Sequence, residues 1–373
     1  MKIEGQTILL TSNEPWGELW FTKHNYAFEL SKKNKVFFIN APLPWKVKNL
    51  LFHKIDAYKY SENLTIITYQ NYFPLVNSVI HYYNNFLISL SLKRFFKRNG
   101  VTDYFLWSFN PTVLYIPKLL GAKFSIFHCA DKHWLDFYGT HTLCKHADAI
   151  FLVSKHILDE YVNYKVPKYI LHHGISKDEF VVEESKLKEL KIEVNDYGLY
   201  VGVIDERIDY ELLEKAIRQN PQTSFVFIGP LRFSSFCLIA DEIFNKKRYS
   251  NVIHLGQKNF KLLKYYISHA KFCISFMNKN ILGNTIAHHK TLLYLAHGKP
   301  VFSYLFSEYK GKENIMYMSE NYEETLKQLG DFLKNGEDHS LKEHRINFAK
   351  EFSYENNFKK AEEFIAEVLS NKN

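Results

Sequence analysis

The chain has 373 residues, 46% of them hydrophobic, which is enough for two domains of ordinary size with large cores. Its net charge of +8 at pH 7 favours an acidic partner such as phosphate or an anionic membrane, whereas nucleic acid ranks last because no nucleic-acid-binding motif accompanies the charge. Four scattered cysteines without a CxxC pair, no apolar stretch of about 18 residues and no signal-peptide core indicate a reduced, cytoplasmic chain without a disulfide framework, a zinc site or a transmembrane helix.

The first half alternates short apolar runs with helical patterns, which predicts a parallel sheet with right-handed crossovers. Ligands of such sheets bind at the carboxyl ends of the strands, so the loop with Asn13, Glu14 and Trp16 is expected to line a cleft. A plain βα turn is the alternative. The expected strands are 6–10, 36–39, 63–69, 104–107, 124–129, 147–153 and 168–171, and the expected helices are 19–32, 72–98 and 111–120.

The helix at 72–98 combines apolar and aromatic residues at helical spacing with a basic end, at Lys93, Arg94, Lys97 and Arg98. Such a helix can lie in a membrane interface, and the positive net charge of the chain supports that interpretation. The alternative is a helix that packs on the core and leaves its basic end in water, where the helix dipole favours positive charge.

Two further features of the first half are candidates for chemistry. Asp131 follows the buried strand 124–129, where it can act as a general base on a hydroxyl, or simply cap the next helix. His172 and His173 are adjacent, but no carboxylate or cysteine lies nearby at ligand spacing, so we do not expect a metal site there.

The second half begins after a charged linker at 180–196. Gly202, Gly229 and Gly256 follow three successive strands, on what should be one edge of the sheet. This recurrence is typical of a nucleotide site in a doubly wound domain, although neither a strict GxGxxG nor a P-loop is present. The expected strands are 198–203, 224–228, 252–255 and 272–276, and the expected helices are 210–220, 260–269 and 348–369.

The stretch NTIAHHKTLLYLAHGKPVFS, residues 284–303, is predicted to form a loop, a helix, a turn and a strand. Lys290 opens the helix, and Gly298 with the following proline ends it. A helix N-terminus next to a lysine, Thr285 and His289 is suited to an anion, here the diphosphate of a nucleotide. An ordinary αβ unit with a glycine cap is the alternative.

Several segments of this chain resemble a known family. YVGVIDERIDYELL, SFVFIGP, NVIHLGQKNFKLLKYYISHAKFCISF and KTLLYLAHGKPV follow the order and spacing of the donor domain in glycosyltransferases of the two-Rossmann-domain (GT-B) type. The chain is most similar to bacterial cell-surface polysaccharide transferases of the teichuronic-acid and xanthan-glucuronosyltransferase kinds. The resemblance implies an α/β fold of two Rossmann-like, doubly wound domains facing across a cleft: an acceptor domain at 1–180, a donor domain at 181–350, and a helix at 351–373 that packs back on the first.

The resemblance also implies an activity and its residues. The enzyme would move a sugar from a UDP-sugar to a glycan or lipid-linked glycan at the inner face of the plasma membrane, without cofactor or metal. FHCADKHW is similar to the segment in which xanthan-type enzymes carry a catalytic aspartate, here Asp131. Asn13, Glu14 and Trp16 would lie on the acceptor side. The expected donor-binding residues are Gly202, Val203, Arg207, Gly229, Gly256, Gln257, Lys258, Thr285, His289 and Lys290.

One departure from the family pattern leaves alternatives open. Many retaining relatives have a ribose-binding glutamate three residues after the lysine, where this chain has Leu293. Leucine cannot accept hydrogen bonds from ribose hydroxyls, so that contact is absent or supplied elsewhere. The xanthan-type enzymes also lack this glutamate, so the resemblance implies an inverting transfer based on Asp131 as a hypothesis. A nucleotide-sugar epimerase using His288, His289 and Asp131, and a degenerate transferase that serves as a scaffold, are the two alternatives.

Overall fold

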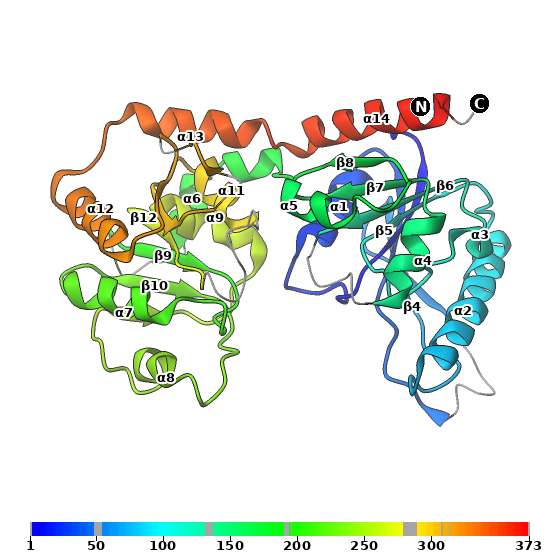
Figure 1. Cartoon of the computed structure of the whole chain (residues 1–373), viewed down its shortest axis with the longest axis horizontal. Coiled ribbons are helices and arrows are strands. Elements are labelled where there is room, and N and C mark those ends of the chain that lie inside the picture. The colour runs from blue at the N-terminus through cyan, green and yellow to red at the C-terminus, as the bar shows by residue number, and fades with distance from the viewer. Residues whose placement is uncertain are drawn as a thin grey trace. The chain divides into compact units, whose positions relative to one another are not determined.

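The computed structural model describes residues 2–47, 54–130, 137–189, 194, 196–278, 289–306, 309–312 and 314–371. The chain folds into two compact units (Figure 1). The N-terminal domain comprises Met1–Gly174 and Tyr354–Asn373, and the C-terminal domain comprises Ile175–Ser353. The boundaries differ by a few residues from those expected at 180 and 350, because the backbone N–H of Ile175 donates to the Phe352 carbonyl oxygen at 2.9 Å and the Ile175 side chain is buried in the second core.

The N-terminal domain contains an eight-stranded sheet in the order β3-β4-β2-β1-β5-β6-β7-β8. All neighbouring strands are parallel except the edge pair β3 and β4. The central six strands therefore have the doubly wound order 3-2-1-4-5-6. The strands are β1 (Thr7–Thr11), β2 (Lys35–Ile39), β3 (Asp56–Lys59), β4 (Leu64–Thr68), β5 (Phe105–Ser108), β6 (Phe124–Cys129), β7 (Ala149–Leu152) and β8 (Lys168–Ile170).

Helices cover both faces of this sheet. Ile8 and Leu10 pack against α1 and α14, whereas Leu9, between them, packs against α2, because successive side chains of a strand point to opposite faces. The last helix of the chain thus belongs to the N-terminal domain, with Tyr354 and Ile365 in its core. The helices are α1 (Thr22–Ser31), α2 (Ser78–Arg98), α3 (Pro117–Leu120), α4 (Tyr138–His146), α5 (Lys155–Glu160) and α14 (Tyr354–Ser370).

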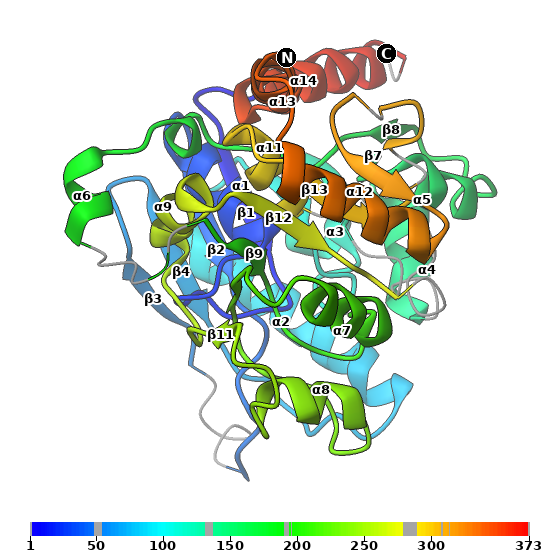
Figure 2. The same cartoon turned by 90° about the vertical axis from the view of Figure 1, so that its left-hand side faces the viewer.

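The C-terminal domain repeats the doubly wound plan with a six-stranded, fully parallel sheet in the order β11-β10-β9-β12-β13-β14 (Figure 2). Its strands are β9 (Gly198–Val201), β10 (Phe225–Ile228), β11 (Val252–His254), β12 (Phe272–Ser275), β13 (Val301–Tyr304) and β14 (Tyr317–Ser319). Its helices are the 3-10 helix η3 (Lys177–Phe180), α6 (Glu184–Glu189), α7 (Tyr210–Gln219), α8 (Leu238–Phe244), α9 (Phe260–His269), α11 (His289–Ala296), α12 (Tyr322–Asn335) and α13 (Ser340–Lys350).

Some helices differ from the predicted ones for local reasons. The helix expected from residue 72 begins at Ser78, because Pro74 precedes it and the Asn77 side chain accepts a hydrogen bond from the Ile80 N–H as an N-cap. The expected helix at 348–369 is two helices, α13 and α14, separated at the domain boundary. The second half of α2 packs on the core, because Leu92 and Phe96 are buried while the basic residues at its end are exposed. This geometry matches the alternative to the membrane-interface interpretation. None of the helices described is long and apolar enough to cross a membrane.

Candidate functional site

The crevice of the C-terminal domain lies where the strand order reverses, between β9 and β12. Open α/β sheets bind their ligands at this point, outside the carboxyl ends of the strands. Gly202 follows β9, and Met277 follows β12. The two segments are joined next to the crevice, because Ile208 and Met277 form an antiparallel bridge and the Asn278 N–H donates to the Arg207 carbonyl oxygen at 2.7 Å.

The three glycines predicted to follow successive strands lie side by side. The Gly202 N–H donates to the Ile228 carbonyl oxygen at 2.9 Å, and the Gly229 N–H donates to the Gly256 carbonyl oxygen at 2.9 Å. Their φ angles are 136°, 147° and 66°, which side chains disfavour. A Cβ on Gly229 would lie 1.9 Å from the Gly202 carbonyl oxygen. The sequence therefore places bare backbone at the edge, where a ligand can approach closely.

Lys290 lies in the first turn of α11, beside these glycines. Its Nζ lies 4.0 Å from the centre of the Tyr200 ring and 3.7 Å from Met277 Sδ. No carboxylate of the described residues lies within 4 Å of this ammonium. Burial, with a smaller effect from Arg207, lowers the pKa of Lys290 from 10.5 to about 7. Among the described residues, this desolvated cation has no paired anion, although Asp205 partly offsets the shift from a distance, and a bound anion would stabilise it.

Other charges near Lys290 are already paired. Arg207 makes a bidentate contact with Asp205, with Nη2 at 2.7 Å from Oδ2 and Nε at 2.9 Å from Oδ1. The Arg207 side chain remains nearly half exposed, so it can still turn toward a ligand. Tyr294 anchors the helix behind Lys290, because its hydroxyl accepts a hydrogen bond from the Val201 N–H at 2.8 Å.

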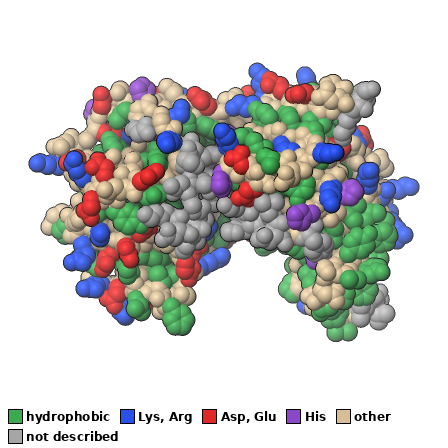
Figure 3. All heavy atoms as spheres, in the orientation of Figure 1, with side chains coloured by type: hydrophobic (Ala, Val, Ile, Leu, Met, Phe, Trp, Pro, Cys, Tyr) green, Lys and Arg blue, Asp and Glu red, His purple; other side chains and the backbone are tan. Residues whose placement is uncertain are grey.

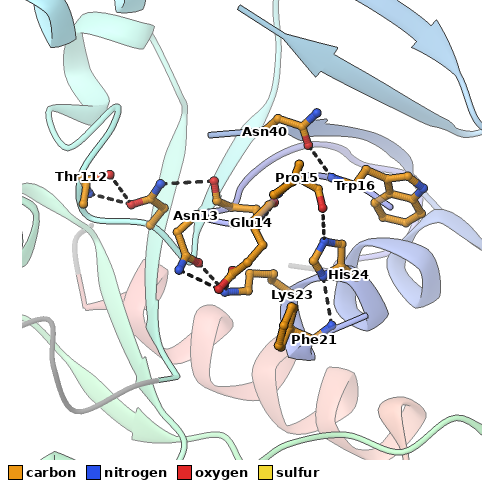
Figure 4. Close-up of polar contacts among 11 residues, drawn as sticks. Asn13, Glu14, Pro15, Trp16, Phe21, Lys23, His24, Asn40 and Thr112 are labelled. Carbon is orange, nitrogen blue, oxygen red and sulfur yellow. Dashed lines mark hydrogen bonds and ion pairs between the residues drawn. The ribbon is translucent and has the colours of Figure 1, made fainter. Parts of the chain in front are cut away.

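The N-terminal domain has a second polar crevice at its own point of strand reversal, between β1 and β5. Lys23, in the first turn of α1, forms an ion pair with Glu14 and donates to the Asn13 amide oxygen (Figure 4). The Asn110 amide donates to the Ser12 carbonyl oxygen at 3.2 Å and accepts from Thr112. This lysine has its counter-charge in place, whereas no carboxylate of the described residues forms an ion pair with Lys290.

His24 fixes the outer part of the same loop. Its Nε2–H donates to the Pro15 carbonyl oxygen at 3.1 Å, and its Nδ1 accepts from the Phe21 N–H at 3.1 Å. Burial lowers the pKa of His24 to about 4, so the ring is neutral at physiological pH. Trp16 packs edge-on against Phe38, at 4.9 Å between ring centres, and the backbone N–H of Trp16 donates to the Asn40 side-chain oxygen at 2.8 Å.

Comparison with known structures shows what this architecture is. A sucrose-phosphate synthase from Thermosynechococcus elongatus is similar, with a TM-score of 0.73 at 13% identity, over 98% of this chain and 100% of that one. The Anabaena protein HepE, in complex with UDP and glucose, gives a TM-score of 0.66 at 12% identity, over 98% and 99%. The chain has the GT-B fold. An Escherichia coli structure described as trehalose-6-phosphate bound with UDP-2-fluoro glucose gives a TM-score of 0.67 at 13% identity, over 97% of this chain and 98% of that one.

Sequence comparison assigns the chain to no family. No protein-family model matches the chain, and no curated protein matches it. The GT-B fold therefore rests on the two doubly wound sheets and their similarity to solved structures. The closer resemblance to teichuronic-acid and xanthan-type transferases stays a prediction.

The GT-B fold brings some of the predicted donor residues together. Gly202, Gly229 and Gly256 meet at one edge, the Val203 carbonyl oxygen accepts from the Tyr200 hydroxyl at 3.0 Å, and Lys290 stands over the Tyr200 ring. Gln257 and Lys258 follow β11, but among the described residues no contact joins them to Lys290. His289 opens α11 beside Lys290. Asp131, Thr285 and His288 lie outside the described residues.

The position that departs from the family pattern has a clear place in the structure. Leu293 is 3% exposed and packs in the core beneath the C-terminal sheet, together with Leu292 and Val226. One turn after Lys290, the helix thus turns this side chain into the core. The paired histidines are bonded within the N-terminal domain: His172 Nδ1 to the Val153 carbonyl oxygen at 3.0 Å, and His173 Nδ1 to the Thr22 hydroxyl at 2.9 Å.

Some residues of the two crevices were not predicted. Lys23, His24 and Asn110 organise the N-terminal crevice, and Tyr200 supports Lys290. The available signal was positional: Lys23 and His24 follow the first strand and its polar loop, as Lys290 follows the loop after β12. The sequence places Lys290 at the start of a helix, but only the fold shows that each lysine lies beside a point of strand reversal.

Proposed function

We propose that this protein transfers a sugar from a UDP-sugar to a glycan or lipid-linked glycan acceptor in the synthesis of a bacterial surface polysaccharide. The observation that carries the proposal is the partly buried Lys290, which has no paired carboxylate in the described parts of the chain, beside the bare backbone of Gly202 and Gly229. Two structures of the same fold hold UDP or a UDP-sugar, which supports this class of donor.

The diphosphate of the donor suits this crevice for an electrostatic reason. An anion close to Lys290 would restore the proton that burial disfavours, because an opposite charge raises the pKa of an ammonium. Charge accumulates on the diphosphate as the bond to the sugar breaks. A fixed cation there stabilises the transition state more than the ground state, and this difference lowers the barrier.

The proposal also gives roles to other predicted residues. Gly256, Gln257 and Lys258, after β11, contact the nucleobase, and Thr285 and His289 flank the diphosphate with Lys290. Arg207 lies near enough to Lys290 to affect its pKa, and it exchanges its contact with Asp205 for the donor. On the acceptor side, Asn13, Glu14 and Trp16 hold the incoming sugar. Trp16 has the aromatic surface on which a sugar ring packs, and the Glu14 carboxylate accepts hydrogen bonds from the sugar hydroxyl groups.

Asp131 is the proposed general base. It comes two residues after the carboxyl end of β6, which is on the ligand-binding edge of the N-terminal sheet. In this role its carboxylate takes the proton of the acceptor hydroxyl as the oxygen attacks the anomeric carbon, a contribution of about 10²–10⁴ in rate. No metal is proposed in the reaction, and EDTA should leave the transfer rate unchanged.

The first experiment is a thermal-shift screen with UDP, GDP and CMP, because a ligand that binds only the folded state raises the midpoint of unfolding. A shift with UDP alone is expected. Asp131→Asn should then abolish transfer while the UDP-induced shift stays. Full activity in Asp131→Asn would refute the base assignment, and absence of any nucleotide effect would refute the donor proposal. Incubating donor without acceptor separates transfer from epimerisation, which needs no acceptor.

A further inference from the structure

The N-terminal domain contains a cavity that the donor site does not use. It lies beyond the carboxyl ends of β2, β4 and β5, under the first half of α2, and measures about 300 Å³. This volume is at the lower end of small-molecule sites. Its lining is largely aliphatic and aromatic, and includes Pro42, Tyr69, Leu75, Asn85, Ile88 and Val113.

Two polar atoms in this lining have no partner among the described residues. They are the Tyr69 hydroxyl and the Asn85 amide nitrogen, and both side chains are more than nine-tenths buried. The oxygen of the same Asn85 amide is used, because it accepts from the Tyr115 N–H at 3.2 Å. Buried polar groups are nearly always hydrogen-bonded. Both orphaned groups can donate, so the ligand that would satisfy them carries an acceptor oxygen.

The cavity meets an exposed apolar surface, the α2 rim, which we define as Leu43, Phe73, Leu75, Val76, Val79, Tyr82 and Tyr83. Leu75 belongs to both, since it lines the cavity and is 57% exposed. The sequence from Tyr72 to Leu92 has no Lys, Arg, Asp or Glu. Figure 3 shows hydrophobic side chains gathered over the α2 end of this domain.

The first half of α2 buries polar side chains and exposes apolar ones, the reverse of an ordinary surface helix. Its buried positions include Asn84 and Asn85, while Val79, Tyr82 and Tyr83 face water. The Asn84 amide explains part of the inversion, because it bonds both the N–H and the carbonyl oxygen of Phe73 at 2.9 Å and so fixes the loop that carries the rim. A helix that exposes its apolar side chains marks a surface for an apolar partner.

The cavity also adjoins the acceptor crevice. Thr112 lines the cavity and donates to the Asn110 amide oxygen at 2.6 Å, and Asn110 donates in turn to the Ser12 carbonyl oxygen in the acceptor loop. A molecule with its polar end at the acceptor loop could therefore continue into the cavity and out along the rim.

We propose that the cavity and the α2 rim bind the hydrocarbon chain of a lipid-linked acceptor, with an oxygen of the chain's linkage accepting hydrogen bonds from Tyr69 and Asn85. This inference rests on the proposed function, since it names the chemical class of the acceptor. A hydrocarbon chain fits because the cavity is small and largely apolar and shares Leu75 with an uncharged apolar strip, which offers an acidic or basic peptide no ionic partner.

The test measures binding of dansylamino-undecanoic acid, a fluorescent hydrocarbon chain with a terminal carboxylate, to the whole protein. One saturable site is expected. Leu75→Asp should weaken binding about tenfold or more, because it places a charge at the mouth of the cavity. Val76→Asp is the matched control: Val76 is 66% exposed on the same rim but does not line the cavity, and this variant should bind within about twofold of the parent.

Tyr69→Phe tests the orphaned hydroxyl. It should weaken probe binding by about threefold to tenfold without lowering the midpoint of unfolding, because the hydroxyl has no partner to lose among the described residues. Unchanged affinity in this variant, no saturable binding, or equal losses in Leu75→Asp and Val76→Asp would overturn the proposal; equal losses would indicate a general apolar contact with a bilayer or a protein. UDP binding is measured on the same variants. Normal UDP binding without the expected probe binding would overturn this proposal and leave the proposed donor site standing.

Discussion

Each domain presents a lysine beside the point where its strand order reverses, on the helix after the first strand for Lys23 and on the helix after the fourth strand for Lys290, yet the two lysines differ in their electrostatic surroundings. Lys23, in the first turn of the helix after β1, is paired with Glu14 and Asn13. Lys290, in the first turn of α11, contacts only an aromatic ring and a thioether among the described residues. The topology fixes where a ligand binds, and the pairing of charge at that place determines which ligand is favoured.

The backbone near Lys290 is open to a ligand, whereas the backbone near Lys23 already has hydrogen-bond partners. In the C-terminal domain, Gly202 and Gly229 leave the strand ends bare, so a ligand can take hydrogen bonds from the chain itself. In the N-terminal domain, Asn110 and His24 already occupy the loop carbonyl groups of Ser12 and Pro15. One crevice is suited to a highly charged ligand, and the other to a neutral, hydroxyl-rich one. This contrast leads to four predictions.

The largest effect is expected from Gly229→Ala. The new Cβ would lie 1.9 Å from the Gly202 carbonyl oxygen, and φ at Gly229 is 147°. The backbone must shift, so we expect a loss of about 3 kcal/mol or more in the stability of the C-terminal domain and loss of nucleotide binding. Scanning calorimetry with and without UDP measures both.

Gly256→Ala is the matched control for this prediction. Its φ is 66°, and no atom lies within 4 Å of an added Cβ. Only the left-handed conformation is penalised, at about 1–2 kcal/mol. If the two variants lost the same stability, close packing of the glycine backbones would not be the reason for Gly229.

The second prediction concerns Lys290. Lys290→Ala should weaken UDP binding about 10- to 100-fold, the value of a hydrogen bond to a charged group, without destabilising the free protein. Isothermal titration measures the affinity. Lys23→Ala should leave UDP affinity unchanged. Equal effects of the two substitutions would contradict the contrast between the domains.

The third prediction concerns the paired lysine. Glu14→Ala removes the counter-charge of Lys23, whose side chain is only 14% exposed, and should cost about 1 kcal/mol of stability. Replacing both residues by apolar ones, Glu14→Leu with Lys23→Met, should recover most of the loss, because no charge is then left unpaired. A double-mutant cycle from chemical denaturation measures the coupling, and a coupling near zero would mean that the pair is not maintained in solution.

Much of the fold follows from the sequence because it depends on local patterns. Glycines after apolar runs mark strand ends, and alternation of strands with helices places those ends on one edge. Gly202, Gly229 and Gly256 are therefore predictable as neighbours, and β6 and α9 have the expected bounds. By contrast, α2 was predicted to begin at 72, because its aromatic residues keep helical spacing through the loop that precedes Asn77.

The features that could not be predicted depend on which face of an element is buried. Asn84 and Asn85 resemble a solvent-exposed strip in sequence, but the structure buries them and exposes Val79. The membrane interpretation therefore pointed to the basic end of α2, whereas the exposed apolar residues are at its other end. Lys23 was missed for a similar reason, because only the tertiary fold brings Glu14 to it.

The last prediction uses pH to separate the two lysines. Burial lowers the pKa of Lys290 from 10.5 to about 7, so in the free protein the proton is progressively lost above pH 7. The cost of burying the charge is fully present below pH 7 and is relieved as the pH rises toward 10.5. Binding a diphosphate above pH 7 must return the proton, so UDP affinity should fall several-fold between pH 7 and pH 9, and binding should take up protons. The phosphate groups do not oppose this trend, because they are already ionised above about pH 6.

Lys290→Arg supplies the control, since an arginine stays charged throughout this range and should remove the slope. A slope that persists in Lys290→Arg would assign the titration to another group and would leave Lys290 without its electrostatic role.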